Sequence, residues 1–245
     1  MNRGFSLLEL LIATAISALV AAAIAAVVPS LQAFFEQAPA AIDLQQRGRT
    51  AVDTIAHAVR SADHVVLLDQ DSSHGGFRQL WTIAPKTNAA QGVVGEDQSG
   101  PGGELWLSAA RCPGVPDVCG FERGSLALIA DGTGRFEVFT VGSVDVAARG
   151  IVPRRRFEQP YAADATVVEV DAYTFRLDPQ PDGSSALVRE TGSGAVQPLV
   201  DRVSELRFER SFDERGIGVT LTLRSQGPRT EESTRRMAIV ARNLR

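Results

Sequence analysis

The sequence lacks the motifs of the common hydrolases and nucleotide-binding enzymes. It contains no G-x-S-x-G, no S-x-x-K, no G-x-x-x-x-G-K-[ST] and no H-E-x-x-H. Histidine occurs only at His57, His64 and His74, and the pattern around the first two is typical of a solvated helix face rather than of a metal site. We therefore expect a protein without catalytic activity, resident metal or other cofactor.

Lysine is almost absent, and the chain carries no excess of positive charge. Lys86 is the only lysine, and the formal net charge is −4. Because nucleic-acid-binding proteins normally present a basic face, nucleic acid is an unlikely principal partner. The one basic run is Arg154–Arg156, beside Phe157 and Tyr161. Its position between two prolines favours a solvated loop, and a surface for nucleic acid or an acidic partner is the alternative.

What the chain has is a long apolar run near its beginning. Leu10–Val28 is a stretch of 19 residues without charge, glycine or proline. As a helix it would extend roughly 28 Å, which is close to the hydrocarbon thickness of a bilayer. Arg3 precedes it, and the next cation is Arg47. The positive-inside rule therefore predicts a cytoplasmic N-terminus and an exported C-terminal region.

Glu9 is unusual because it places a carboxylate at the edge of this apolar run. Ionisable residues within membrane segments are costly and generally have a partner. Cleavage after Gly4 would create one, because the α-amino group of Phe5 would lie one helical turn away, on the same chain or on a neighbour. Such a pair would neutralise both charges and dock one helix against the next.

The segment Gly4-Phe5-Ser6-Leu7-Leu8-Glu9 resembles the cleavage and methylation motif of type IV pilins and type II secretion pseudopilins. The resemblance implies that a prepilin peptidase cuts between Gly4 and Phe5 and N-methylates Phe5. It also implies that Glu9 pairs with the N-terminus of an adjoining subunit. The implied partners are other pilin-like subunits, major and minor, and the inner-membrane assembly platform.

Two ordinary targeting segments are the alternatives to this resemblance. A signal peptide could be cut at Ala38-Pro39-Ala40, but the apolar run exceeds the usual core of roughly 7–15 residues. A plain signal-anchor helix fits the length and leaves Glu9 unexplained.

The patterning predicts an α+β, pilin-like fold with a long N-terminal helix from Phe5 to about Ser61, packed on an antiparallel β-sheet domain. Pro29 and Pro39 predict kinks or a local break. Val52, Ile55, Val59 and Ala62 form an apolar stripe at helical spacing. The expected divisions are a leader at 1–4, a membrane or filament-core helix at 5–28, an amphipathic helix at 29–62 and a periplasmic β-rich domain at 63–245.

Beyond residue 63 the apolar period becomes two, with turn residues between the runs. Asp178–Gly183 predicts a hairpin turn, and Thr87–Gly103, rich in glycine, predicts a mobile loop or a binding surface. Eleven strands are expected, at 65–68, 79–84, 104–108, 125–130, 135–141, 166–177, 186–190, 195–199, 202–211, 218–224 and 236–242.

Two small features could carry further chemistry. Cys112 and Cys119 lie in a loop rich in proline and glycine, where an exported protein is expected to form a disulfide; free thiols are the alternative. Asp69, Asp71 and Ser73 have the spacing that opens a calcium loop, but His74 occupies the position of its glycine and Leu80 that of its last ligand. Calcium is therefore a weak candidate, and a β-turn is the alternative.

Residues 197–208, 219–224 and 237–243 also resemble the closing hairpin of the larger minor subunits, the J-type pseudopilins and W-type minor pilins. We expect a minor subunit that assembles or primes a type II secretion pseudopilus or a type IV pilus, located in the bacterial inner membrane, with the filament tip as a further location. Two alternatives remain open. One is a tip adhesin that binds through Thr87–Gly103 and the cysteine loop, and the other is a membrane-anchored periplasmic hydrolase.

Overall fold

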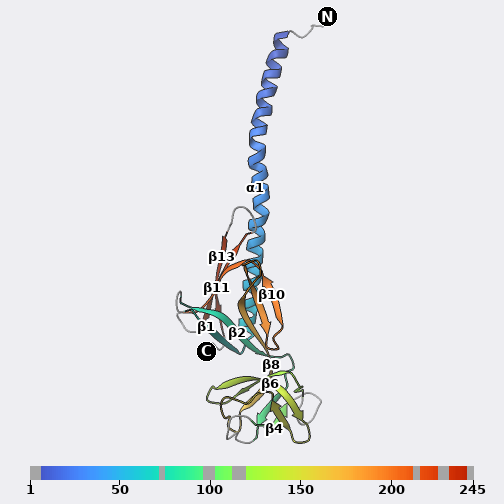
Figure 1. Cartoon of the computed structure of the whole chain (residues 1–245), viewed down its shortest axis with the longest axis vertical. Helices are drawn as coiled ribbons and strands as arrows, with labels where there is room; N and C mark the ends of the chain where they lie inside the picture. The colour runs from blue at the N-terminus through green and yellow to red at the C-terminus, as the bar shows by residue number, and fades with distance from the viewer. Residues whose placement is uncertain are drawn as a thin grey trace.

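The structure is a computed structural model with one long helix and 13 strands in its described part. It describes residues 7–71, 75–95, 103–111, 120–211, 216–225 and 232–241, and for 29–41 and 109–111 it describes the backbone alone. The N-terminal part of the helix projects alone from one end of the molecule, and the strands lie at the other end (Figure 1).

The helix, α1, runs from Leu7 to Ser61 as a single α-helix of 55 residues. It continues through Pro29 and Pro39, so the predicted local break is wrong. Each proline removes only one backbone hydrogen-bond donor, and the helix continues on both sides of it. The helix ends where the backbone amide of Asp63 donates to Ile83 O at 2.9 Å, which starts the first strand pairing.

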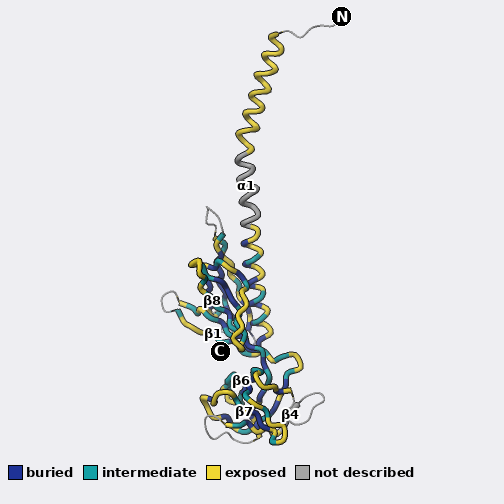
Figure 2. Tube along the Cα trace, turned by 45° about the vertical axis from the view of Figure 1, so that its right-hand side comes forward, coloured by how far each residue is buried: buried dark blue, intermediate teal, exposed yellow. Residues whose placement is uncertain are grey.

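The second half of α1 packs on the sheet through the predicted stripe. Val52, Ile55, Val59 and Ala62 are each at most 2 % exposed. They pack with the inner faces of strands β12 (Gly216–Arg224) and β13 (Glu232–Val240). The predicted stripe is therefore confirmed as a surface of α1 that docks on the β domain, and Figure 2 shows the change from exposed to buried along α1.

The strands beside α1 form what we call the proximal lobe. All their pairings are antiparallel, and two groups of strands meet through the pair Phe77–Phe208. Besides β12 and β13, the lobe contains β1 (His64–Gln70), β2 (Phe77–Pro85), the second half of β8 (Thr166–Pro179), β9 (Ser185–Thr191), β10 (Val196–Val200) and β11 (Val203–Arg210). The β8–β9 hairpin turns at Asp182-Gly183, as predicted.

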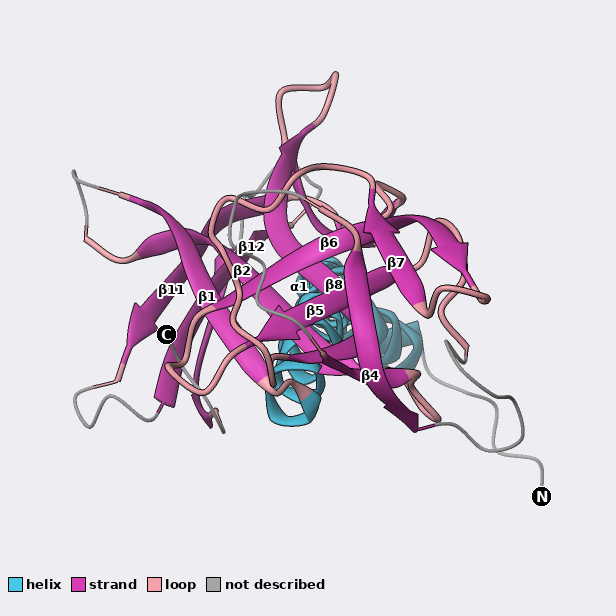
Figure 3. Cartoon of the chain, turned by 90° about the horizontal axis from the view of Figure 1, so that it is seen from below, coloured by secondary structure: helices cyan, strands magenta, loops and turns pink. Residues whose placement is uncertain are grey.

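Beyond the end of α1 the chain forms a small barrel, which we call the distal barrel (Figure 3). Pairing runs β8–β3–β4–β7–β6–β5 and closes back on β8. Its interior is filled by apolar side chains such as Ile129, Ile151 and Val167, all 0 % exposed. The strands are β3 (Gln91–Val94), β4 (Leu105–Arg111), β5 (Leu126–Ala130), β6 (Phe136–Asp145), β7 (Gly150–Pro153) and the first residues of β8.

Strand β8 joins the lobe to the barrel because its side chains reach three separate groups of buried residues. Val167 lies in the barrel, Val170 and Ala172 lie in a small cluster between the two parts, and Phe175 lies in the core under α1. The predicted region 63–245 therefore contains two main hydrophobic cores on one continuous strand.

The coarse α+β prediction is confirmed, and all eleven predicted strands are present. Two strands were missed, β3 and β7. The loop prediction for Thr87–Gly103 is wrong at Gln91–Val94, which forms β3, while 96–102 lie outside the described residues. Gly92 is a packing residue here, because a β-carbon on it would lie 2.6 Å from Leu107 Cδ1.

We predict that Gly92→Ala lowers the free energy of unfolding by about 1–3 kcal/mol, because the added methyl group crowds the buried Leu107 side chain. In a Leu107→Ala background the same substitution should cost less, since the crowded atoms are gone. Denaturant titration of the four chains in detergent measures this coupling. Equal costs in both backgrounds would show that Leu107 is not the constraint.

Candidate functional site

The first 22 residues of α1 that the structure describes form an apolar rod that the rest of the described structure leaves exposed. Leu7–Val28 has a mean hydropathy of 2.6, and none of it is buried. Leucines and isoleucines such as Leu7, Ile16 and Leu19 are more than half exposed. The helix is long enough to cross a bilayer, at about 33 Å by the rise of an α-helix. So much exposed apolar surface requires a membrane or neighbouring helices.

Glu9 is the only acidic residue in the first turn of this rod, and it is exposed. The position suits a carboxylate, because the N-terminal end of a helix carries a partial positive charge. Further along, the hydroxyl of Thr14 donates to Leu11 O at 3.0 Å, which satisfies this group within the helix. Gly4 and Phe5, the predicted cleavage and methylation residues, lie outside the described residues.

Comparison with protein families matches residues 1–25 to the prokaryotic N-terminal methylation motif. The chain carries a prepilin-type N-terminus. The match supports a pilin-like or pseudopilin-like protein that a prepilin peptidase processes, and together with the apolar helix it supports membrane anchoring. Comparisons with curated proteins and with solved structures find no match.

The structure places the other predicted sites only in part. Cys112 and Cys119 lie outside the described residues, so the disulfide stays a prediction. The backbone of Asp69 has a positive φ of 59°. Asp71 Oδ2 forms an ion pair with Arg78 Nη2 at 3.0 Å. Ser73 lies outside the described residues. No group of three potential metal ligands occurs among the described His, Cys, Asp and Glu, and calcium stays a prediction.

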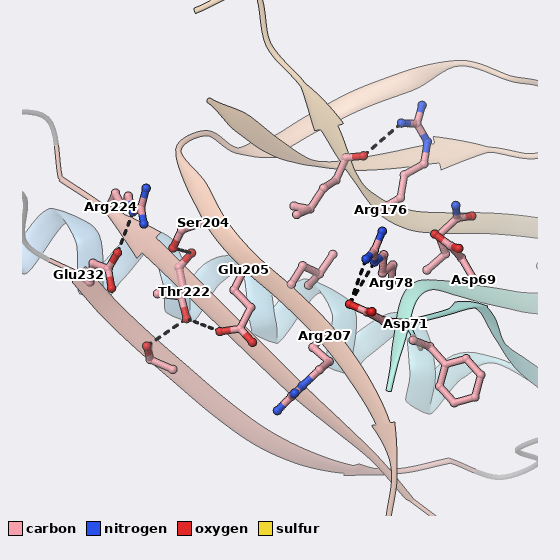
Figure 4. Close-up of a pocket in the computed structure, with 15 residues that line it drawn as sticks. Asp69, Asp71, Arg78, Arg176, Ser204, Glu205, Arg207, Thr222, Arg224 and Glu232 are labelled. Atoms are coloured by element: carbon pink, nitrogen blue, oxygen red, sulfur yellow. Dashed lines mark hydrogen bonds and ion pairs between the residues drawn. The ribbon is translucent and has the colours of Figure 1, made fainter. Parts of the chain in front are cut away.

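A polar hollow of the proximal lobe lies on the face of β11–β13 that points away from α1 (Figure 4). We call it the paired groove, and its volume is about 730 Å³. Arg224 Nε meets Glu232 at 2.7 Å, and Arg78 meets Asp71 at 3.0 Å. Arg176 bonds Asp178 and Glu190 at 2.7 and 2.9 Å. Because these guanidinium groups are neutralised within the chain, the paired groove offers little to a charged ligand.

The structure separates the arginine run from the aromatic residues that follow it in the sequence. Phe157 and Tyr161 are 3 % and 2 % exposed and stack edge to face in the distal barrel. Desolvation by burial raises the pKa of Tyr161 to about 12. The exposed Arg154–Arg156 instead lines a hollow with Trp81 and Phe136, which come from β2 and β6. Sequence reasoning missed this pairing because the residues are far apart in the chain.

We predict that the double substitution Ile16→Arg/Leu19→Arg releases the protein from membranes. Each arginine at the centre of a span costs about 2.5–3.5 kcal/mol of insertion free energy. The matched control is Ile42→Arg/Val146→Arg, which places the same charges on exposed positions outside the apolar rod. Alkaline carbonate extraction and immunoblotting measure the membrane fraction. Equal retention of both variants would contradict a membrane role for Leu7–Val28.

Proposed function

We propose that the protein is a non-enzymatic minor subunit of a type II secretion pseudopilus or a type IV pilus. It would insert in the bacterial inner membrane with its N-terminus in the cytoplasm and its β domain in the periplasm. The observation that carries the proposal is the methylation motif at residues 1–25 on an apolar helix that no other described residue buries. A prepilin peptidase would cut between Gly4 and Phe5 and methylate Phe5.

Assembly would proceed by packing the Leu7–Val28 helices of neighbouring subunits. Lipid chains are as apolar as leucine, so polar pairs and small residues decide which helices associate in a membrane. Ala13, Ala15, Ser17 and Ala18 permit close approach of backbones. Glu9 lies at the exposed start of the helix, where it could meet the N-terminal amine of an adjoining subunit.

The distal barrel favours a minor or tip position over a bulk position. It lies beyond the C-terminal end of α1, at the opposite end of the molecule from the apolar rod (Figure 1). When parallel helices stack along a filament, the β domain of the next subunit lies in this same direction. A barrel at this position would occupy the space of that neighbouring β domain. A terminal subunit has no further subunit on this side and so avoids the clash. The same position supports the second candidate function, a binding module carried on a pilin stem.

We predict that Glu9→Ala inserts in the membrane normally but enters filaments at least about tenfold less, because the amine of the neighbouring subunit loses its carboxylate. Thr14→Ala is the matched control, since its hydroxyl bonds the backbone of its own helix. Immunoblots of sheared filaments and of membranes from the native cell give the two fractions. Normal incorporation of Glu9→Ala would rule out the pairing.

We also predict that the protein recovered from membranes of its native cell begins at N-methylated Phe5. Intact mass and N-terminal sequencing measure this directly. A Gly4→Val variant should retain residues 1–4, because the cleavage motif is lost. A wild-type chain that begins at Met1 or near Ala41 would contradict processing by a prepilin peptidase.

A further inference from the structure

A second hollow of about 940 Å³ lies where the proximal lobe meets the distal barrel, and we call it the arginine groove. Strands of both parts line it. Val66 and Leu68 come from β1 and Trp81 from β2, while Phe136 and Val138 come from β6 of the barrel. The groove is therefore formed by the two parts together, which also touch directly where His64 of β1 stacks on Phe136 of β6 at 4.5 Å between ring centroids.

The floor of the arginine groove is apolar. Trp81, Phe136 and Val138 are partly buried and pack on the small cluster of Ile83, Leu128, Val170 and Ala172. Leu68 lies at the margin with 38 % of its surface exposed. These side chains present apolar surface to solvent within a concave site, which is a common feature of protein-binding surfaces.

One wall of the groove is basic, and its position is held by the backbone. Arg154–Arg156 follows β7, and the amide of Arg154 donates to Thr140 O at 2.8 Å. All three side chains are exposed. Unlike the arginines of the paired groove, none of the three makes an ion pair or a side-chain hydrogen bond with a described residue. Three guanidinium groups thus keep their donors available at one site.

Two carboxylates also line the groove, and they do not neutralise this wall. The amide of Glu158 donates to Glu137 Oε2 at 3.1 Å, so these two residues interact with each other. Burial raises the pKa of Glu137, and the charge of Glu158 acts in the same direction. Neither carboxylate forms an ion pair with Arg154–Arg156 in the described part of the chain.

We propose that the arginine groove binds an extended segment of a partner protein in which acidic and apolar residues alternate. In an extended chain, successive side chains point to opposite sides, so apolar groups can meet the floor while carboxylates meet the arginines. Guanidinium groups bind carboxylates with paired hydrogen bonds. The inference goes beyond the assembly role proposed above and does not depend on it.

Protein is favoured over nucleic acid as the occupant for two reasons. Glu137 and Glu158 lie in the same groove and would repel a continuous phosphate backbone, whereas a peptide can place its carboxylates at the arginines alone. The net charge of the chain, −4, opposes the approach of any anion, and it opposes a nucleic acid more than a short peptide because every nucleotide carries a phosphate charge.

The test is fluorescence anisotropy with the full chain in detergent and a labelled decapeptide in which glutamate alternates with leucine and phenylalanine. We expect saturable binding that weakens with added NaCl, because the contacts are exposed charges. In Arg154→Gln/Arg155→Gln/Arg156→Gln the affinity should fall at least about tenfold. The matched control is Arg60→Gln/Arg210→Gln/Arg236→Gln, which removes the same charge from exposed arginines outside the groove and should bind like wild type.

Two further binding measurements separate the contribution of charge to the affinity from that of the apolar surface. The peptide with glutamine in place of glutamate should bind at least about tenfold more weakly, and Leu68→Gln should weaken the acidic peptide because it removes part of the apolar margin. Thermal unfolding checks that each variant is folded. No binding by wild type, equal loss in the control variant, or tighter binding of a single-stranded oligothymidine than of the acidic peptide would each overturn the proposal.

Discussion

Burial of one apolar stripe holds the second half of α1 against the sheet, and the rest of the molecule is arranged around that contact. Val52, Ile55 and Val59 have nearly no exposed surface, whereas the leucines and isoleucines before Val28 are more than half exposed. The same helix is therefore a soluble-domain element at one end and a membrane or filament element at the other. The change follows from composition, because the first half is apolar on every side and the second half on one side only.

Strand β8 determines how the two β parts are related. Its 14 residues contribute side chains to the barrel, to the connecting cluster and to the core under α1. On each edge of β8 the pairing passes from a barrel strand to a lobe strand within a few residues, from β3 to β2 on one edge and from β5 to β9 on the other. The distal barrel is consequently held at a defined place beyond the helix, and the arginine groove with it.

The distribution of charge pairs distinguishes the paired groove from the arginine groove. In the paired groove, Arg78, Arg176 and Arg224 each have a carboxylate within 3.0 Å, so the site is close to neutral. In the arginine groove, three neighbouring guanidinium groups have no such partner among the described residues. Exposed ion pairs contribute little to stability. The contrast therefore matters for recognition, because the arginines of the arginine groove, unlike those of the paired groove, have no carboxylate partner among the described residues and can donate to another molecule.

The sequence by itself determined the membrane segment, the processing motif, the helical stripe and all eleven predicted strands, since each depends on residues that are close together in the chain. It did not reveal β3 or β7, because β3 is four residues long and its glycine looks like a loop signal until Leu107 is placed beside it. Nor did it reveal that the strands close into a barrel, since closure depends on which distant edges meet at β8. The sequence showed Arg154–Arg156 as a basic run, but the aromatic residues that follow it, Phe157 and Tyr161, are buried in the barrel. Only the tertiary structure decided that Trp81 and Phe136 lie beside the arginines, because strand pairing brings together residues that are far apart in the chain.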